Sequence, residues 1–86
     1  MERYETAIKK GYRYIAVCVH VEDYDMPEII INPYVNFEKK LAYYKSAYNE
    51  DGTLKANPKI RLVMCACSNY LDKLTASITE YFENIK

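Results

Sequence analysis

The stretch YRYIAVCVHVE, Tyr12 to Glu22, decides the fold of this 86-residue chain because it is the longest strand-like run in the sequence. Side chains that alternate along a strand point to opposite faces of a sheet. One face is apolar and carries Ile15, Val17, Val19 and Val21. The other face is mixed and carries Tyr12, Tyr14, Ala16, Cys18 and His20. This pattern is typical of a central strand whose second side is partly covered.

Length and composition predict one domain, residues 1–86. A chain of this size buries enough surface for one modest core. Twelve basic residues balance twelve acidic ones, so no global field attracts the protein to nucleic acid or to a membrane. No apolar run approaches the ~20 residues that span a bilayer, and the first residues resemble no signal peptide. The three cysteines are an odd number without a secretory signal, so we expect reduced thiols and a cytoplasmic protein.

The segments around the long strand predict a short helix before it and a partner strand after it. The helix covers about Glu2 to Lys10 and stops at Gly11. The segment Glu22 to Pro27 contains turn-forming residues and reads as a hairpin connection. Glu28 to Asn32 is then the returning antiparallel strand. Pro27 and Pro33 bound it and indicate an edge position, since proline cannot donate to a ladder.

A second helix follows, with a third strand after it. Asn36 is a candidate N-cap, with Asn32 followed by Pro33 as an earlier start, and Glu50-Asp51-Gly52 ends the helix. Its apolar stripe is Phe37, Leu41, Tyr44 and Tyr48. Thr53 to Lys59 reads as a linker, and Ile60 to Cys67 as a strand that is largely apolar on both faces. The long connection favours a crossover that makes the second and third strands parallel.

The last segment predicts an amphipathic helix capped by Ser68 or Asn69. Its apolar stripe is Leu71, Leu74, Ile78, Tyr81 and Ile85, widened by Phe82. The element order is therefore α-β-β-α-β-α. We predict an α+β domain with a three-stranded mixed sheet of order 2-1-3, against which the second and last helices pack.

The side chains suited to chemistry do not predict a catalytic or metal site. Cys18, His20, Cys65 and Cys67 are zinc-type ligands, but residues two apart on a straight strand are about 6 to 7 Å apart, too far for easy convergence on one ion. Nothing marks a helix N-terminus or a cleft that would activate a thiol beside His20. With only two glycines, the chain also has no phosphate-binding loop. We expect no enzyme, no cofactor and no metal.

The hairpin is the predicted partner-binding surface. It gathers acidic side chains and a tyrosine without an intervening base: Glu22, Asp23, Tyr24, Asp25 and Glu28. An acidic patch of this kind suits a basic protein surface, and tyrosine is enriched at interfaces. The alternative is a weak single-stranded nucleic-acid-binding module that uses Tyr12, Arg13 and Tyr14, although the neutral charge disfavours it. Self-association is a further expectation, since three strands leave two open edges and an uncovered Tyr14/Ala16/Cys18 face.

The stretch EIIINPYVNFEKKLAYYKSAYNEDGTLK, Glu28 to Lys55, resembles small orphan proteins of phages and prophages in low-GC Gram-positive bacteria. The resemblance lies in the free use of Lys, Tyr, Asn and Ile over about a third of the chain, without a diagnostic motif. It implies a compact accessory protein that acts by stoichiometric binding, in the manner of anti-CRISPR and other anti-defence inhibitors. It assigns no role to any single residue. We therefore expect a non-enzymatic protein-binding module, with a host nuclease or defence complex as the partner that the resemblance suggests.

Overall fold

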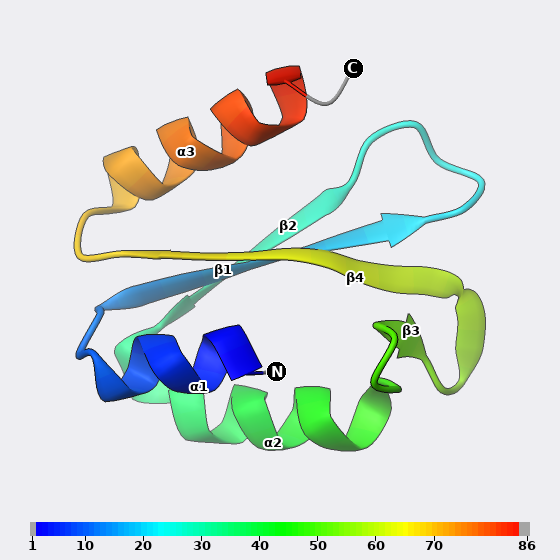
Figure 1. Cartoon of the computed structure of the whole chain (residues 1–86), viewed down its shortest axis with the longest axis horizontal. Coiled ribbons are helices and arrows are strands. Elements are labelled where there is room, and N and C mark those ends of the chain that lie inside the picture. Colours follow the sequence, from blue (N-terminus) through cyan, green and yellow to red (C-terminus); the bar gives the residue numbers. More distant parts are fainter. Residues whose placement is uncertain (1, 85–86) are drawn as a thin grey trace.

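The central strand of the sheet is β1 (Tyr14–Val21), as its alternating pattern predicted. A computed structural model describes residues 2–84 of the chain (Figure 1). In it β1 pairs antiparallel with β2 (Glu28–Pro33) on one side and with β4 (Asn57–Ser68) on the other. A short strand, β3 (Thr53–Leu54), pairs antiparallel with β4. The resulting order is β2-β1-β4-β3, which places β2 at an edge, where its flanking prolines predicted it.

Two parts of the predicted sheet are wrong. The sheet has four strands rather than three, because the Thr53–Lys59 segment, expected to be a linker, forms β3 and the start of β4. It is also antiparallel throughout rather than mixed. β2 and β4 do run in the same direction, since both are antiparallel to β1, but β1 separates them. The α+β class and the relative order of the three long strands are confirmed.

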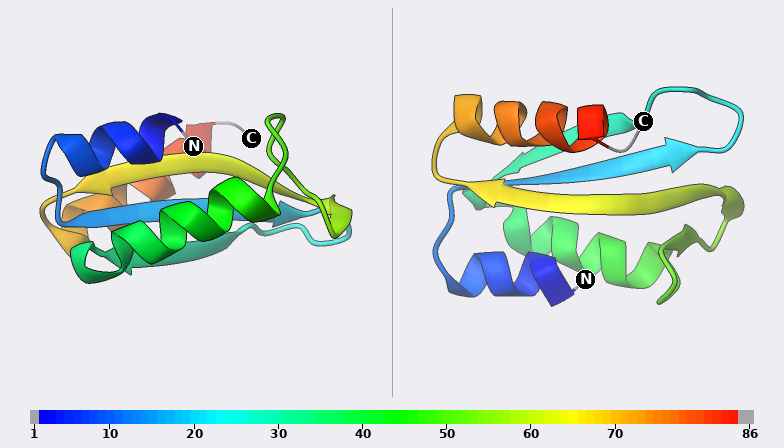
Figure 2. Two further views of the ribbon diagram at one scale, coloured as in Figure 1. Left: turned by 90° about the horizontal axis from the view of Figure 1, so that it is seen from below. Right: turned by 45° about the horizontal axis from the view of Figure 1, so that its top comes forward.

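Two helices cover one face of the sheet (Figures 1 and 2). They are α1 (Glu2–Lys9) and α2 (Phe37–Ala47), the second preceded by a 3-10 turn, η1 (Tyr34–Asn36). The core on this face consists of Tyr4, Ala7, Ile15, Val17, Val19, Phe37 and Tyr44. The ring of Tyr4 meets those of Phe37 and Tyr44 edge to face, with centroids 5.8 and 5.7 Å apart. The β-branched face of β1 is therefore covered by aromatic side chains from both helices.

The third helix, α3 (Leu71–Asn84), covers part of the opposite face (Figure 1). It buries Leu74 and Ile78 against Ala16 and Cys18 of β1, with Phe82 packed beside them. The Tyr14/Ala16/Cys18 face, expected to be open for self-association, is thus occupied by the chain's own last helix. Ile85, the final member of the predicted stripe, lies outside the described residues. No helix among residues 2–84 has the length and apolarity needed to cross a bilayer.

The ends of the first two helices follow from local backbone chemistry. Gly11 adopts φ +79° after α1, and the amides of Gly11 and Tyr12 donate to the carbonyls of Ile8 and Ala7. This is a Schellman motif, which confirms the predicted stop. α2 ends at Ala47, earlier than the predicted Glu50-Asp51-Gly52 boundary, because Tyr48 turns extended and bridges to Leu54.

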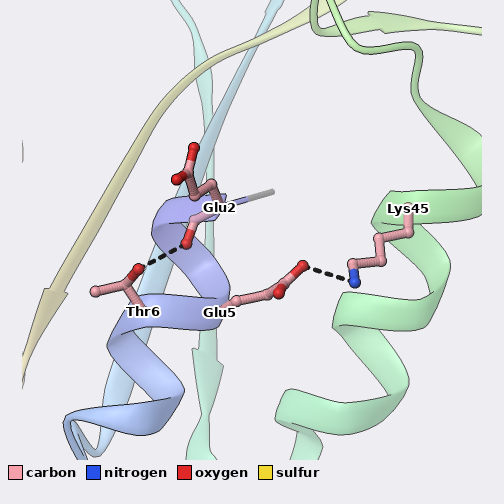
Figure 3. Close-up of polar contacts among 4 residues, drawn as sticks. All are labelled: Glu2, Glu5, Thr6 and Lys45. Atoms are coloured by element: carbon pink, nitrogen blue, oxygen red, sulfur yellow. Dashed lines mark hydrogen bonds and ion pairs between the residues drawn. The ribbon is translucent and has the colours of Figure 1, made fainter.

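An ion pair joins α1 to α2 on the outside of the molecule (Figure 3). The Nζ of Lys45 lies 2.6 Å from Oε1 of Glu5. The hydrogen bond from Lys45, together with its charge, lowers the pKa of Glu5. Thr6 points away from α2, and its hydroxyl donates to the carbonyl oxygen of Glu2 at 2.9 Å. α1 therefore contacts α2 with the side that carries Glu5, and the side that carries Thr6 points away from α2.

We expect Ile78→Ala to lower the free energy of unfolding by about 2 to 4 kcal/mol, because it opens a cavity beneath α3. Ile78 is only 1% exposed, so its whole side chain contributes to packing. Ser77→Ala, at an exposed position of the same helix, is the matched control and should change stability by less than ~0.5 kcal/mol. Urea unfolding followed by circular dichroism measures both. Equal effects of the two substitutions would contradict the placement of α3.

We expect Tyr4→Phe to leave the protein as stable as the wild type or up to about 1 kcal/mol more stable. The Tyr4 hydroxyl is fully buried, and it has no hydrogen-bond partner among the described residues. Removing a hydroxyl from water without a new hydrogen bond lowers the free energy of unfolding, and phenylalanine has no hydroxyl to bury. Tyr44→Phe is the comparison, since the Tyr44 hydroxyl accepts a bond from Asn32 at 3.3 Å and its removal should destabilise. A Tyr4→Phe variant less stable than Tyr44→Phe would show that the Tyr4 hydroxyl is satisfied.

Candidate protein-binding surface

The acidic hairpin predicted as a binding surface connects β1 to β2 and projects from one end of the sheet (Figure 1). Its tip is a turn in which the amide of Tyr24 donates to the carbonyl oxygen of Val21 at 2.9 Å. The Nε2 atom of His20 lies 3.0 Å from the carbonyl oxygen of Tyr24, and this oxygen can only accept, so that nitrogen carries the proton. The lone histidine therefore helps to shape the turn.

All five predicted partner-binding residues are exposed: Glu22, Asp23, Tyr24, Asp25 and Glu28. Asp23 lies 3.9 Å from the Nζ of Lys59 on β4, a long contact between two exposed side chains. Such surface pairs contribute little to stability. The hairpin carboxylates are thus available to interact with a basic surface.

An apolar band continues from the hairpin along β2 and into η1. Its six side chains, called here the apolar edge, are Tyr24 (66% exposed), Met26 (77%), Ile29 (46%), Ile31 (37%), Tyr34 (62%) and Val35 (70%). They account for six of the eleven large hydrophobic side chains exposed in the described residues, yet they lie within twelve consecutive positions. Clustered apolar exposure on an edge strand marks an interaction surface more strongly than scattered single residues do.

The position of α3 explains why the two isoleucines of β2 are exposed. Ile29 pairs with Cys18 and Ile31 with Ala16, so both point to the face that α3 covers. α3, however, lies over β4 and β1 and does not extend across β2 (Figure 2). The intervening Ile30 points to the opposite face and packs against the α1/α2 core.

Most of the apolar edge was missed by sequence reasoning, which selected Tyr24 but not the other five residues. The signal available was the run of three isoleucines between two prolines. A strand that is apolar on both faces requires two covered sides, whereas proline marks an edge, where such cover ends. That conflict indicates exposed isoleucines.

The residues of the nucleic-acid alternative do not share one face. Tyr12 packs against the core beneath α1 and α2, whereas Tyr14 packs against the core beneath α3. Arg13 lies exposed between them, and its backbone amide donates a hydrogen bond to Oδ1 of Asn69 at 3.1 Å. Base stacking needs aromatic faces on a common surface, and these two rings do not form one.

The four zinc-type ligands are divided between the two faces of the sheet. Cys18 and His20 are two residues apart on β1, so they share the face of the sheet that α3 covers. Cys65 and Cys67 pair with Val17 and Ile15 and so share the opposite face. Among residues 2–84 no three His, Cys, Asp or Glu side chains gather closely enough to hold a metal ion.

The thiols are held in their protonated form. Burial raises the pKa of Cys18, and burial together with the neighbouring Cys67 raises that of Cys65 to about 11. Burial also raises the pKa of Cys67. A nucleophilic thiol needs the opposite shift, because the thiolate is the reactive form. The cysteine environment therefore favours packing over covalent chemistry.

Comparison of the chain with protein-family models, with curated proteins and with solved structures finds no match.

Above about pH 9 we expect the free energy of unfolding to fall, and Cys65→Ser to reduce this fall. The unfolded thiol ionises near its ordinary pKa of 9.0, while the folded thiol stays protonated up to about 11. In this range the folded state binds more protons, so raising the pH favours unfolding. The measurement is urea unfolding from about pH 7.5 to about pH 10. A steeper fall in Cys65→Ser than in the wild type would refute the assignment.

Proposed function

We propose that this protein is a non-enzymatic protein-binding module whose partner docks on the apolar edge and the acidic hairpin. The observation that carries the proposal is the concentration of exposed apolar side chains along β2 and its two flanks. An interface needs an apolar centre and a polar rim. Ile29 and Ile31 supply the centre, and the hairpin carboxylates supply the rim at one end.

The proposed partner presents basic and apolar groups together. Glu22, Asp25 and Glu28 form no ion pair within residues 2–84, so their charges are not neutralised by the chain itself. Complementary positive charge on a partner would accelerate association and fix its orientation. The apolar anchors would determine how long the complex lasts, because desolvated contacts control dissociation.

We further propose that the partner is an enzyme of bacterial defence, such as a CRISPR effector, and that the protein inhibits it by occupying its surface. This narrower proposal rests on the resemblance of Glu28–Lys55 to small phage accessory proteins. That segment contains β2 and η1, which carry most of the apolar edge. A stoichiometric binder needs a surface of this kind and no catalytic centre.

To test the surface, capture from a lysate of a low-GC Gram-positive bacterium is compared between the wild type and two variants. Asp25→Lys should slow association and Ile31→Ser should accelerate dissociation, each with about a tenfold loss of affinity. Glu80→Lys makes the same charge reversal as Asp25→Lys on the exposed side of α3 and should bind as the wild type does. Retention of every captured protein by both hairpin and edge variants would rule out this surface.

To test the narrower proposal, DNA cleavage by a purified CRISPR effector nuclease is measured while the protein is added. Inhibition should saturate at about one protein per nuclease, since a binder is not regenerated. Ile31→Ser should shift the titration to higher concentration, and Glu80→Lys should leave it unchanged. If effectors of several classes cleave DNA undiminished at excess protein, CRISPR effectors are not the target. The binding surface itself is tested separately, by the capture experiment.

A further inference from the structure

The outer edge of β4 is open over its second half. β3 pairs with β4 no further than Arg61, and the last bond on that side runs from the Leu62 amide to the carbonyl oxygen of Gly52. From Val63 to Ser68 the strand therefore has β1 on one side and, among residues 2–84, no strand on the other. Along these six residues, the outward-facing backbone N–H and C=O groups have no strand partner among residues 2–84, so another strand can pair with them.

A groove follows this open edge on the side of the sheet that carries α1. In Figure 1, β4 runs in front of the sheet with α3 above it and α1 below it. Two adjoining hollows of about 470 and 670 Å³ follow the strand and share Glu2, Arg3, Met64 and Cys65. Thr6 of α1 and Lys10, the residue directly after α1, form one wall of the larger hollow, and Tyr81 contributes from α3.

We propose that a second copy of this chain closes the groove, its β4 adding antiparallel to β4 about a twofold axis. The product is one continuous eight-stranded sheet. The broad side of the molecule, which contains the groove, measures 33 × 30 Å, whereas the third extent is 16 Å. A side of those dimensions accommodates the ~800 Å² per partner of a standard interface.

The charges on α1 are complementary to themselves under this twofold. Glu2, Thr6 and Lys10 are spaced four residues apart and line the same hollow. The Lys10 amide donates to the Thr6 carbonyl oxygen, so the helical spacing reaches Lys10 and the three side chains form one stripe. Thr6 lies midway and points away from α2 (Figure 3). If the twofold axis passes near Thr6, the stripe of the second copy runs in the opposite direction. Each Glu2 then lies opposite the Lys10 of the other copy. Neither side chain forms an ion pair within residues 2–84.

The geometry of antiparallel pairing restricts the register. Directly opposed residues point to the same face, so a twofold perpendicular to the sheet permits only registers whose paired residue numbers add to an even sum. The open segment, residues 63–68, is centred between Cys65 and Ala66. The two permitted central registers therefore pair Cys65 with Cys65, or Cys65 with Cys67, of the second copy. Both place thiols opposite each other on the α1 side of the sheet.

This inference goes beyond the proposed function and does not depend on it, because the apolar edge on β2 lies across the sheet from β4. A dimer formed through β4 leaves both apolar edges at its outer margins. Each dimer could then engage two partner molecules, or two sites on one partner, and gain affinity by avidity.

The first experiment measures mass by sedimentation equilibrium over a range of chain concentrations. The wild type should be dimeric, and Cys67→Lys, which places a charge at the exposed edge, should be monomeric. Ala42→Lys adds the same charge to the exposed side of α2 and should remain dimeric. A wild type that is monomeric at millimolar chain concentration would overturn the proposal. Partner capture by such a monomer would still uphold the proposed function, so the two failures are distinguishable.

The second experiment tests the α1 contact by a charge-swap cycle. Glu2→Lys and Lys10→Glu each replace two attractive pairs by two repulsive ones, so each should weaken dimerisation about tenfold. The double variant restores the attraction with the signs exchanged and should return to within about threefold of the wild-type dissociation constant. Simple additivity of the two losses would refute the antiparallel α1 contact.

The third experiment identifies the register by oxidation with copper phenanthroline, which takes two electrons as two thiols lose their protons and form one disulfide. Opposed residues in an antiparallel pair have Cα atoms about 4.5 to 5.5 Å apart, which a disulfide spans. A covalent dimer that survives Cys67→Ser supports the Cys65–Cys65 register. One lost in both Cys67→Ser and Cys65→Ser supports the Cys65–Cys67 register. Cross-linking that persists in Cys65→Ser, or requires Cys18, contradicts the proposal.

Discussion

A strand that is apolar on both faces has to be covered twice, and β1 imposes this requirement on the whole chain. Five consecutive residues, Ile15 to Val19, are buried, although neighbouring side chains point to opposite sides. Two layers of helices and a neighbouring strand on each side are needed to shield such a segment. At Val63, β4 carries one more residue than β1. This bulge shifts the register by one residue, and the two strands stay paired on both sides of it.

A chain of 86 residues has too little helix to cover every strand as fully as β1. On one face, α3 contacts β4 and β1. On the other face, α1 and α2 pack on β1, and they also contact β4 and β2 respectively. What remains uncovered lies at the margins of the sheet. The two margins differ in chemistry. β2 is short, acidic at its start and exposed at Ile29 and Ile31. The open half of β4, residues 63–68, carries no charged side chain. We therefore assign them to different kinds of partner.

Local patterns were sufficient to predict those elements that local chemistry determines. The alternation of β1, the prolines around β2 and the glycine after α1 each specified its element and, in the last two cases, its limits. β3 could not be predicted, because a two-residue strand has no periodicity. It depends on Gly52, whose φ of +93° and whose carbonyl contact with the Leu62 amide appear only when the chain is folded. A Cβ atom there would approach the Leu62 carbonyl oxygen to 2.8 Å.

Only the acidic residues of the candidate surface and Tyr24 were predictable. Acidic residues in a hairpin are exposed wherever the hairpin lies, so their placement needed no tertiary information. The exposure of Ile29 and Ile31 depends on which strands α3 crosses, a property set by the tertiary path of the chain after Ser68. The alternation that grouped Tyr12 with Tyr14 failed for a local reason. Tyr12 precedes the strand, so its side chain follows the turn at Gly11 rather than the pleat of β1.

The attachment of α3 has a consequence for the dynamics of the protein. This helix rests on the sheet through the side chains of Leu74, Ile78 and Phe82, and its backbone hydrogen bonds lie within the helix rather than in the sheet ladder. Opening of this helix as a unit would leave the four strands paired, as in cooperative local unfolding of one part of a protein. Such an opening would expose the thiol of Cys18 to alkylating reagents, so its rate of modification reports how often the last helix leaves the sheet.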